Sequence, residues 1–534
     1  MPEIQIQKFD TRYRLPYWAL AEQRRLDGMR TAVLDQAFAL ALERLGVADD
    51  GELCIRNLFA QVHLNLDGTD ESLTRKWSLA LAEEIGLAMR HGATSNVVVY
   101  HSRRQAMMDL AISVSRGDLR RGWAWRQLGL WRSRDVASKS QAISELVRSL
   151  CAETALVVPV LRALAEAGAL DRIAVGLSEW QWEELALAAL SERGPAGVLD
   201  EASYSPSPRA LRDALLVLKR SLLLGVIASS RPFRDASPAV CRALAVLAVL
   251  DVEPMLLRTE TVQAVIGIVA DAVRSGRNET IKGSDEVAGP AVEQLAESMS
   301  ASAQLAESMS ASAQSVDSET AAPVTPGDTD TPELSHDPAR RTREVELGKP
   351  PYPGTERDQK DTKPTDLRQR ALTPSGGLLF LLGVVEDLKL PEEVLAHPAL
   401  GARRFLWVIH QLALALADIH PNDPAALAFA GLPPQAKPPS DDEEAPSEIE
   451  ALALNSFVAR IVESLRSLLE REDDPNKVLL EFVCSRCAEV VAEPGWIEVR
   501  FSLDDVSTEI RRAGLDLDPG YLPWLGVVVK FIYE

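Results

Sequence analysis

The spacing of apolar residues changes along the first part of the chain. A helical pattern from Tyr17 to about Leu45 predicts a helix that ends at Gly46. From Leu58 to Leu66 every second residue is apolar, which predicts a half-buried strand. Asp67-Gly68 ends that strand, and the spacing then returns to one apolar residue per helical turn. A second helix is therefore expected to carry Leu73, Trp77, Leu81, Ile85 and Met89.

Two further strands complete an α+β pattern. Residues 4–9 predict a short opening strand, and residues 96–100 predict another one. A helix that carries Met107, Leu110 and Ile112 follows. These elements predict an α+β N-terminal domain over residues 1–135.

Helical spacing then continues almost without interruption to residue 275. Short breaks rich in Gly, Pro and Ser separate the apolar stretches, so the pattern predicts roughly six amphipathic helices. Helices of this kind pack as an irregular bundle or as a solenoid-like array. We therefore expect a helical domain over residues 136–275.

Residues 276–370 have a different composition. They are rich in Ser, Glu, Asp, Thr and Pro, and Tyr352 is their only aromatic residue. Such a segment cannot bury enough apolar surface to offset its ordering entropy, so it predicts a long disordered linker. The sequence LAESMSASAQ at Leu295–Gln304 is repeated at Leu305–Gln314. We interpret this tandem repeat as slippage of repetitive DNA in a tolerant linker; the start of a repeating rod is the alternative.

Beyond the linker, the apolar pattern returns. Leu378–Leu388 and Arg403–Ile419 predict two buried helices within a helical segment over residues 371–432. Residues 433–448 contain two Pro-Pro pairs and an acidic run, and predict a second linker.

The last unit, residues 449–534, again predicts an α+β structure. It opens with a helix near Glu448, and Ile497, Val499 and Phe501 alternate with polar residues as in a one-sided strand. Val527–Tyr533 predicts a final strand. The expected fold class is therefore mainly α and multi-domain, with α+β N-terminal and C-terminal parts, a helical middle and a long disordered linker.

Charge and hydropathy limit the function classes. The 534 residues carry a formal net charge of −21, which repels a phosphate backbone, so we expect no nucleic-acid partner. The longest strongly apolar runs, such as Gly377–Val385, are about half the length that crosses a bilayer, so we expect no membrane span. The first residues resemble no secretory signal, and the five cysteines are too few for a disulfide framework. A cytoplasmic protein with reduced thiols is expected.

The chain contains no recognisable catalytic motif. It lacks a P-loop, a GxGxxG fingerprint, HExxH and GxSxG. Cys484 and Cys487 have a metal-like or redox-like spacing, but no second pair of ligands accompanies them. They lie in a stretch, Val478–Val491, that predicts a helix, and we interpret them as buried structural thiols. We therefore expect no enzyme, no cofactor and no metal; an enzyme that uses these two cysteines is the alternative.

The most unusual local composition lies between Arg116 and Arg134. This segment contains six arginines and three tryptophans, with Asp118 as its only acidic residue. Arginine and tryptophan are enriched at protein interfaces, and they also stack on nucleic-acid bases. A helix junction anchored by tryptophans, with solvated arginines, is the third interpretation. The candidate protein interface comprises Arg120, Arg121, Trp123, Trp125, Arg126 and Trp131.

Three stretches carry a family resemblance. Within Ile55–Trp125, the sequence SRRQAMMDLAISVSRGDLRRGWAW places a helix and a Gly-containing turn before a Trp pair. Thr373–Leu390, TPSGGLLFLLGVVEDLKL, opens a Gly-Leu-Leu-rich helix, and IRRAGLDLDPGYLPWLGVVVKFIYE ends the chain from Ile510. These stretches resemble proteins encoded with phage-tail-like contractile injection systems, including the tape-measure-like group and uncharacterised members of the same gene clusters.

The resemblance implies a structural role without catalytic residues. Contractile injection systems are extracellular machines with a rigid tube inside a sheath on a baseplate, so tube, sheath or baseplate proteins are the implied partners. A tape measure must match the length of the tube. As one helix the whole chain would span about 800 Å, but the pattern predicts folded blocks, and the linker alone would reach on the order of 300 Å. An assembly factor, adaptor or cap-associated protein therefore fits better than a ruler. A stand-alone cytoplasmic adaptor or scaffold that binds proteins is the alternative.

Overall fold

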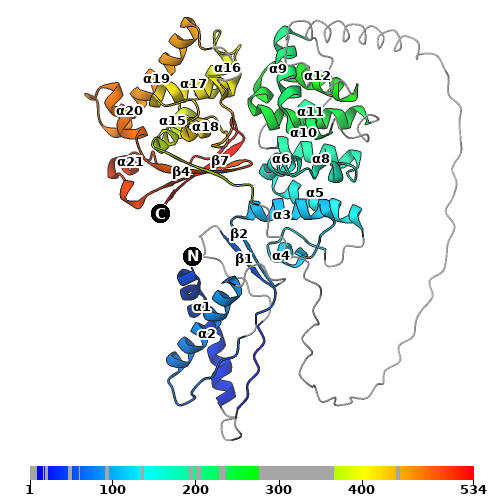
Figure 1. The fold of residues 1–534 in the computed structure, drawn as a ribbon, viewed down its shortest axis with the longest axis vertical. Coiled ribbons are helices and arrows are strands. Elements are labelled where there is room, and N and C mark those ends of the chain that lie inside the picture. Colours follow the sequence, from blue (N-terminus) through cyan, green and yellow to red (C-terminus); the bar gives the residue numbers. More distant parts are fainter. Residues whose placement is uncertain are drawn as a thin grey trace, which may run out of the picture. The chain divides into compact units, whose positions relative to one another are not determined.

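Helices dominate the computed structural model, and small sheets lie near each end of the chain, which confirms the expected mainly α fold with a helical middle and α+β parts near both ends (Figure 1). The structure describes residues 9–15, 17, 22–45, 51–58, 60–90, 96–133, 138–191, 196–199, 206–227, 236–275, 366–439 and 445–534, with the backbone alone for 35–45, 89–90 and 196–197. Residues 4–8 of the strand expected over 4–9, the helix stop at Gly46 and residues 276–365 of the linker expected over 276–370 lie outside this description. The linker prediction is wrong at its end, because Gln369 and Arg370 already form part of a strand.

Two long helices form the first part of the fold. They are α1 (Glu22–Leu45) and α2 (Asp70–Arg90), which the periodicity predicted as helices, and they pack against each other. The Thr69 hydroxyl accepts a hydrogen bond from the Ser72 backbone N–H at 3.3 Å, which begins α2. A two-stranded antiparallel sheet, β1 (Glu52–Ile55) with β2 (Val97–Tyr100), follows. The apolar residues of α2 that contact α1 or lie buried include Leu73, Trp77, Leu81 and Ile85.

The strand predicted over Leu58–Leu66 is wrong, although the alternation of exposed and half-buried residues that predicted it is present in the structure. The described residues 58 and 60–65 form no strand, and β1 ends before them. Their alternation is real: Gln61, His63 and Asn65 are exposed. The half-buried apolar residues between them pack on α1 and α2 instead of forming part of a sheet. An extended segment can therefore alternate because it lies on helices, without the hydrogen-bonded neighbour that defines a strand.

The middle of the chain forms a stack of helices (Figure 1). Two helices, α3 (Arg103–Arg116) and α4 (Gly122–Gln127), lead into it. We use the name helical array for the elements that follow, which are more numerous and shorter than the rough expectation: α5 (Lys139–Ala152), η2 (Thr154–Leu156), α6 (Val157–Glu166), α7 (Leu170–Ala174), α8 (Glu179–Leu190), η3 (Ala196–Leu199), α9 (Pro208–Arg220), α10 (Leu222–Ile227), α11 (Pro238–Val252), η5 (Pro254–Arg258) and α12 (Val262–Arg274).

Helix α11 lies at the centre of the helical array. It is apolar on every side and contacts α6, α8, α9, α10 and α12, so only a position surrounded by other helices suits it. Serine N-caps begin several of these helices. The hydroxyls of Ser138, Ser207 and Ser237 each accept from the backbone N–H three residues further on. Pro208 and Pro238 follow two of these caps at a position where the missing N–H costs nothing.

Residues 366–534 form a C-terminal unit with a five-stranded sheet in the order β3-β4-β5-β7-β6. Strands β5 and β7 are parallel, and the other pairs are antiparallel. Its elements are β3 (Gln369–Thr373), η6 (Gly376–Phe380), α15 (Leu381–Asp387), α16 (Leu390–Ala396), α17 (Phe405–Ala417), α18 (Pro424–Phe429), α19 (Glu448–Leu469), α20 (Asn476–Cys484), β4 (Ala488–Glu493), β5 (Trp496–Phe501), η8 (Leu503–Asp505), α21 (Thr508–Arg512), β6 (Gly520–Leu522) and β7 (Val527–Tyr533).

Segments that the sequence suggested as separate share this sheet and one apolar core. Strand β3 pairs with β4 over the register Gln369↔Ala492 to Thr373↔Ala488. The ring of Phe380 lies 5.0 Å from the rings of both Phe501 and Phe531. The Pro-rich residues between the two segments are packed as well, because Pro434, Pro438 and Pro439 are buried. Helices 371–432 and the sheet therefore form one folding unit around a common core.

A pair of glycines allows two elements of this core to approach closely. A side chain at Gly377 would place its Cβ 2.0 Å from the carbonyl oxygen of Val483 in α20. At Gly376 the Cβ would lie 2.3 Å from that of Ala488. The Gly-Gly-Leu-Leu sequence therefore follows from the tight contact of η6 with α20 and β4.

Candidate functional site

The three tryptophans of the candidate interface are not surface residues. Trp123, Trp125 and Trp131 have relative exposures of 9%, 0% and 3%. The rings of Trp125 and Trp131 lie 6.2 Å apart, in contact with one another. As placed here, their rings contribute to the packing of the chain itself, so they are closed to a partner.

A buried polar network holds the side chains of Arg121 and Trp125 in place. Arg121 Nη1 lies 2.5 Å from Asp109 Oδ1, and the Tyr100 hydroxyl donates to Asp109 Oδ2 at 2.9 Å. The indole N–H of Trp125 donates to the same hydroxyl at 3.0 Å. Burial raises the pKa of Asp109, and the neighbouring Arg121 opposes that rise. This network matches the third interpretation of the segment, a helix junction anchored by tryptophans.

The remaining arginines of the segment are closer to solvent. Arg120 has an exposed side chain, and its guanidinium pairs with Asp118 at 2.7 Å. Arg126 is half-buried and donates to the carbonyl of Ser133 at 3.4 Å. Arg134 lies outside the described residues. A partner contact through Arg120 or Arg126 stays a prediction.

The two cysteines with metal-like spacing are separated by a change of secondary structure. Cys484 ends α20 and is buried, whereas Cys487 is exposed just before β4. The helix predicted over Val478–Val491 is therefore wrong after Cys484, because the chain turns into a strand there. Burial raises the pKa of the Cys484 thiol to about 12, so it is a poor nucleophile at neutral pH. Within the described residues, no group of three or more His, Cys, Asp and Glu side chains is arranged to hold a metal ion.

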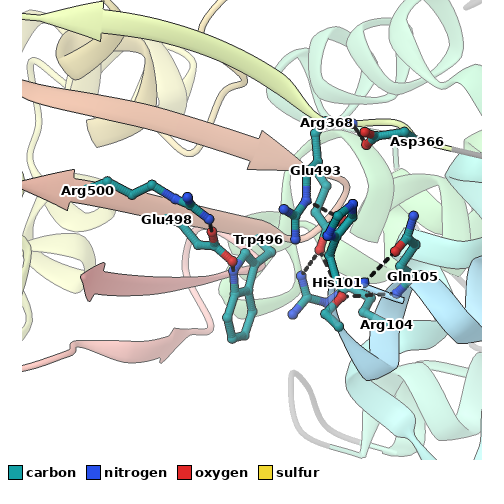
Figure 2. Close-up of polar contacts among 10 residues, drawn as sticks. His101, Arg104, Gln105, Asp366, Arg368, Glu493, Trp496, Glu498 and Arg500 are labelled. Carbon is teal, nitrogen blue, oxygen red and sulfur yellow. Dashed lines mark hydrogen bonds and ion pairs between the residues drawn. The ribbon is translucent and has the colours of Figure 1, made fainter. Parts of the chain in front are cut away.

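The most developed cluster of buried charges joins α3 to the C-terminal unit (Figure 2). Arg104 reaches from the first turn of α3 to Glu493 at the end of β4, with 2.7 Å between Nη1 and Oε1. Their side chains are only 8% and 5% exposed. Ser102, the N-cap of α3, donates from its hydroxyl to the same carboxylate oxygen at 3.4 Å. Arg368, just before β3, lies 3.9 Å from the other oxygen.

An aromatic ring and a second ion pair extend this cluster along the sheet. The guanidinium of Arg104 lies 3.8 Å from the centre of the Trp496 ring, as in a cation–π contact (Figure 2). The indole N–H of Trp496 donates to Glu498 at 3.1 Å, and Arg500 donates to the other oxygen of Glu498 at 2.9 Å. Burial lowers the pKa of Arg104 to about 10, and the carboxylates of Glu493 and Glu498 oppose that shift. The guanidinium of Arg104 therefore stays charged at neutral pH.

A second pair of buried charges connects the helical array to the C-terminal unit. Glu253, at the end of α11, lies 3.4 Å from Arg404 Nε and accepts from the backbone N–H of Leu406 at 3.2 Å. Burial raises the pKa of Glu253 to about 7, and Arg404 opposes that rise. Arg258 and Glu392 form a further, more exposed ion pair between the same two regions.

Two glycine turns of the sheet touch two prolines of the helical array. Gly495, in the turn between β4 and β5, has a φ of +76°, and a Cβ there would lie 2.5 Å from Pro159 Cγ. Gly526, before β7, has a φ of +70°, and its Cβ would lie 3.0 Å from Pro254 Cγ. Both turns need glycine for their backbone conformation and for this approach. We use the name junction for these contacts together with the pairs Arg104–Glu493 and Glu253–Arg404.

A cleft of about 310 Å³ lies within the junction. Its lining combines apolar residues such as Leu406 and Val527 with the charged residues Arg162 and Asp251. Asp251 accepts from the Ser221 hydroxyl at 3.1 Å and from the Leu222 N–H at 3.2 Å, so it serves to begin α10. The geometry of the junction suits holding two parts of the chain in a fixed relation, and the pairs Arg104–Glu493, Glu253–Arg404 and Arg258–Glu392 connect those parts.

Sequence reasoning missed the junction. Arg104 and Glu493 are 389 positions apart, and neither lies in a pattern that predicts a partner. One local signal was present: Ser102 begins a helix in which Arg104 lies just before the apolar residues that start at Ala106. A charged residue on a buried helix face requires a counter-charge, but the sequence does not say which acidic residue supplies it.

The comparisons add no relative. A scan against protein-family models, a search of curated proteins and a search of solved structures each found no match. Among the helices that the structure describes, none is both long and apolar enough to cross a membrane.

Proposed function

We propose that this chain is a non-catalytic assembly protein of an extracellular contractile injection system, in which it acts as an adaptor or cap-associated protein. The junction is the observation that carries the proposal. Described residues on both sides of the segment 276–365 belong to one compact unit, and buried ion pairs connect them. A protein built to position other proteins benefits from such a fixed relation between distant parts of its sequence.

The junction also disfavours the ruler. A ruler must extend along the tube, and extension of this chain would separate Arg104 from Glu493 and Glu253 from Arg404. Separation of such pairs exposes the apolar core around them and costs the packing of Gly495 on Pro159. An adaptor keeps these contacts, so it agrees better with the fold.

The stretches that carry the family resemblance support the assignment by their positions. Thr373–Leu390 forms the end of β3, η6 and α15, and Ile510–Glu534 forms α21, β6 and β7. Both belong to one core, where Phe380 and Phe531 are in contact. A resemblance that falls on interacting elements is expected when two proteins share a fold unit rather than scattered residues.

Electron microscopy of a producing strain that lacks this gene tests the proposal. We expect loss of particles or misassembled particles, and recovery when the intact gene is restored. Particles of normal number and form would overturn the proposal. Particles of variable tube length would favour the ruler instead.

The second candidate function is a stand-alone cytoplasmic scaffold that binds protein partners outside any injection system. The same junction favours it, because a fixed relation between two surfaces serves any scaffold. Affinity purification of the tagged protein separates the two functions. Recovery of tube, sheath or baseplate proteins supports the assembly role, and their absence beside other stable partners supports the scaffold.

A further inference from the structure

Helix α8 carries apolar residues on the face that points away from the helical array. Its inner face is formed by Gln181, Trp182, Leu185 and Ala186, all buried. On the other face Trp180 is 60% exposed and Leu187 is 48% exposed. These two residues are seven positions apart, so they lie along one side of the helix.

The acidic residues of the same face lack partners among the described residues. Glu183 and Glu184 are half-buried and lie one helical turn from both Trp180 and Leu187, and the carboxylate of Glu184 contributes to the raised pKa of Cys151 in α5. No described Lys or Arg lies within salt-bridge distance of either carboxylate. Neighbouring helices differ, because Glu145 pairs with Arg148 and Glu166 with Arg162.

Helix-dipole stabilisation does not explain these two carboxylates. Glu179 lies in the first turn of α8, where a negative charge is favourable next to the free backbone N–H groups. Glu183 and Glu184 lie beyond that turn, so the helix dipole stabilises their negative charges only slightly. Their position between Trp180 and Leu187 therefore requires another account.

We propose that this outer face of α8, formed by Trp180, Glu183, Glu184 and Leu187, docks a basic amphipathic helix of a partner protein. The inference rests on the proposed function, because an adaptor needs a partner surface, and it names that surface. An exposed indole beside a leucine supplies an apolar anchor of the kind that dominates binding energy at interfaces. The flanking carboxylates select lysine or arginine on the partner and set the orientation of its helix.

Site-specific photo-crosslinking in a producing strain tests the proposal. A photoreactive p-benzoylphenylalanine replaces Trp180, and mass spectrometry identifies the cross-linked peptide. We expect a segment of another protein in which Lys or Arg flanks aliphatic residues at helical spacing. The same photoreactive residue at Leu452 is the matched control, because Leu452 is 71% exposed on α19 and is not part of the surface.

Three results would overturn the proposal. They are cross-links only to this chain or to a second copy of it, a cross-linked segment without basic residues, and the same cross-linked segment from position 452. Absence of any cross-link from position 180 would count equally against it.

Binding of the identified segment, made as a synthetic peptide, gives a second measurement. Trp180→Ala is expected to weaken binding at least about tenfold, whereas Leu452→Ala leaves it unchanged. The double change Glu183→Lys and Glu184→Lys is expected to weaken binding and to reverse its dependence on salt. Unchanged affinity in both variants would contradict the docking surface. Circular dichroism of each variant confirms that the helices remain folded.

The outcomes separate this inference from the proposed function. If the deletion strain fails to assemble particles but position 180 yields no basic partner, the docking surface is wrong and the assembly role stands. If position 180 cross-links to a basic helix while particles form normally without the gene, the surface stands and the assembly role is wrong.

Discussion

The two buried ion pairs of the junction are equally hidden from water but differ in how well they are satisfied. Arg104 and Glu493 lie 2.7 Å apart, and Trp496 and Ser102 complete their surroundings. Glu253 and Arg404 lie 3.4 Å apart, and burial raises the pKa of Glu253 to about 7. A buried charge is stable only when enough partners replace its lost water. The first pair is therefore the better satisfied of the two, whereas the raised pKa of Glu253 makes the second pair titrate near neutrality.

The largest effect is expected where the better satisfied pair is broken. Arg104→Ala leaves the carboxylate of Glu493 buried with only the Ser102 hydroxyl and the more distant Arg368 beside it, so the free energy of unfolding is expected to fall by about 3–5 kcal/mol. Denaturant titration of the purified protein measures it. The double change Arg104→Met with Glu493→Leu is expected to recover only part of the loss, because Arg368, which is 7% exposed, then loses the carboxylate beside it. A loss in Arg104→Ala below about 1 kcal/mol would contradict the buried pair.

The second pair makes stability depend on pH. Folding raises the pKa of Glu253 from 4.5 to about 7, so proton binding favours the folded state. This contribution is complete below pH 4.5 and is lost as the pH rises through about 7, for a total of about 3 kcal/mol. Glu253→Gln removes the titrating group, so its stability is expected to change less between pH 5 and pH 8. Glu392→Gln, in the exposed pair with Arg258, is the control and should keep the dependence of the unchanged protein.

A smaller effect is expected at the glycine turn that faces Pro159. Gly495→Ala forces a side chain into a positive φ and into contact with the proline ring, at a cost of about 2 kcal/mol. Gly129→Ala is the matched control. Gly129 has a φ of +71° but nothing within 4 Å of its Cβ position. Gly129→Ala is therefore expected to lose only the about 1 kcal/mol that a positive φ costs a residue with a Cβ. Equal losses in the two variants would show that the turn does not press on Pro159.

The smallest effect is expected at the exposed edge of the junction. Arg258 and Glu392 form an ion pair whose side chains are 38% and 52% exposed, so solvent and salt screen it. Arg258→Ala is expected to change the free energy of unfolding by less than about 1 kcal/mol. A loss of unfolding free energy as large as that of Arg104→Ala would mean that solvent exposure does not set how much each ion pair stabilises the fold.

The tryptophans show where sequence reasoning succeeds and fails. A cluster of three tryptophans with arginines suggested a surface, yet Trp125 is fully buried and hydrogen-bonded to Tyr100. Trp180 lies outside that segment of unusual composition, yet it is 60% exposed. The composition of a segment shows which residue types are available for an interface. Whether they are exposed depends on which other parts of the chain pack against them. The exposed face of α8 follows only from knowing which of its sides contacts the helical array.

Periodicity alone determined much of this protein, because it is a local property. It placed the helices α1 and α2 and the strand β7, and it predicted a helical middle, since apolar spacing matches the geometry of each element. Tertiary structure alone decided that residues 371–432 share a core with the last strands, that 58–66 lie on helices, and that Arg104 meets Glu493. Such contacts join residues far apart in the chain. Their free energy comes from packing and charge compensation, and neither produces a regular spacing of residue types that could be read from the sequence.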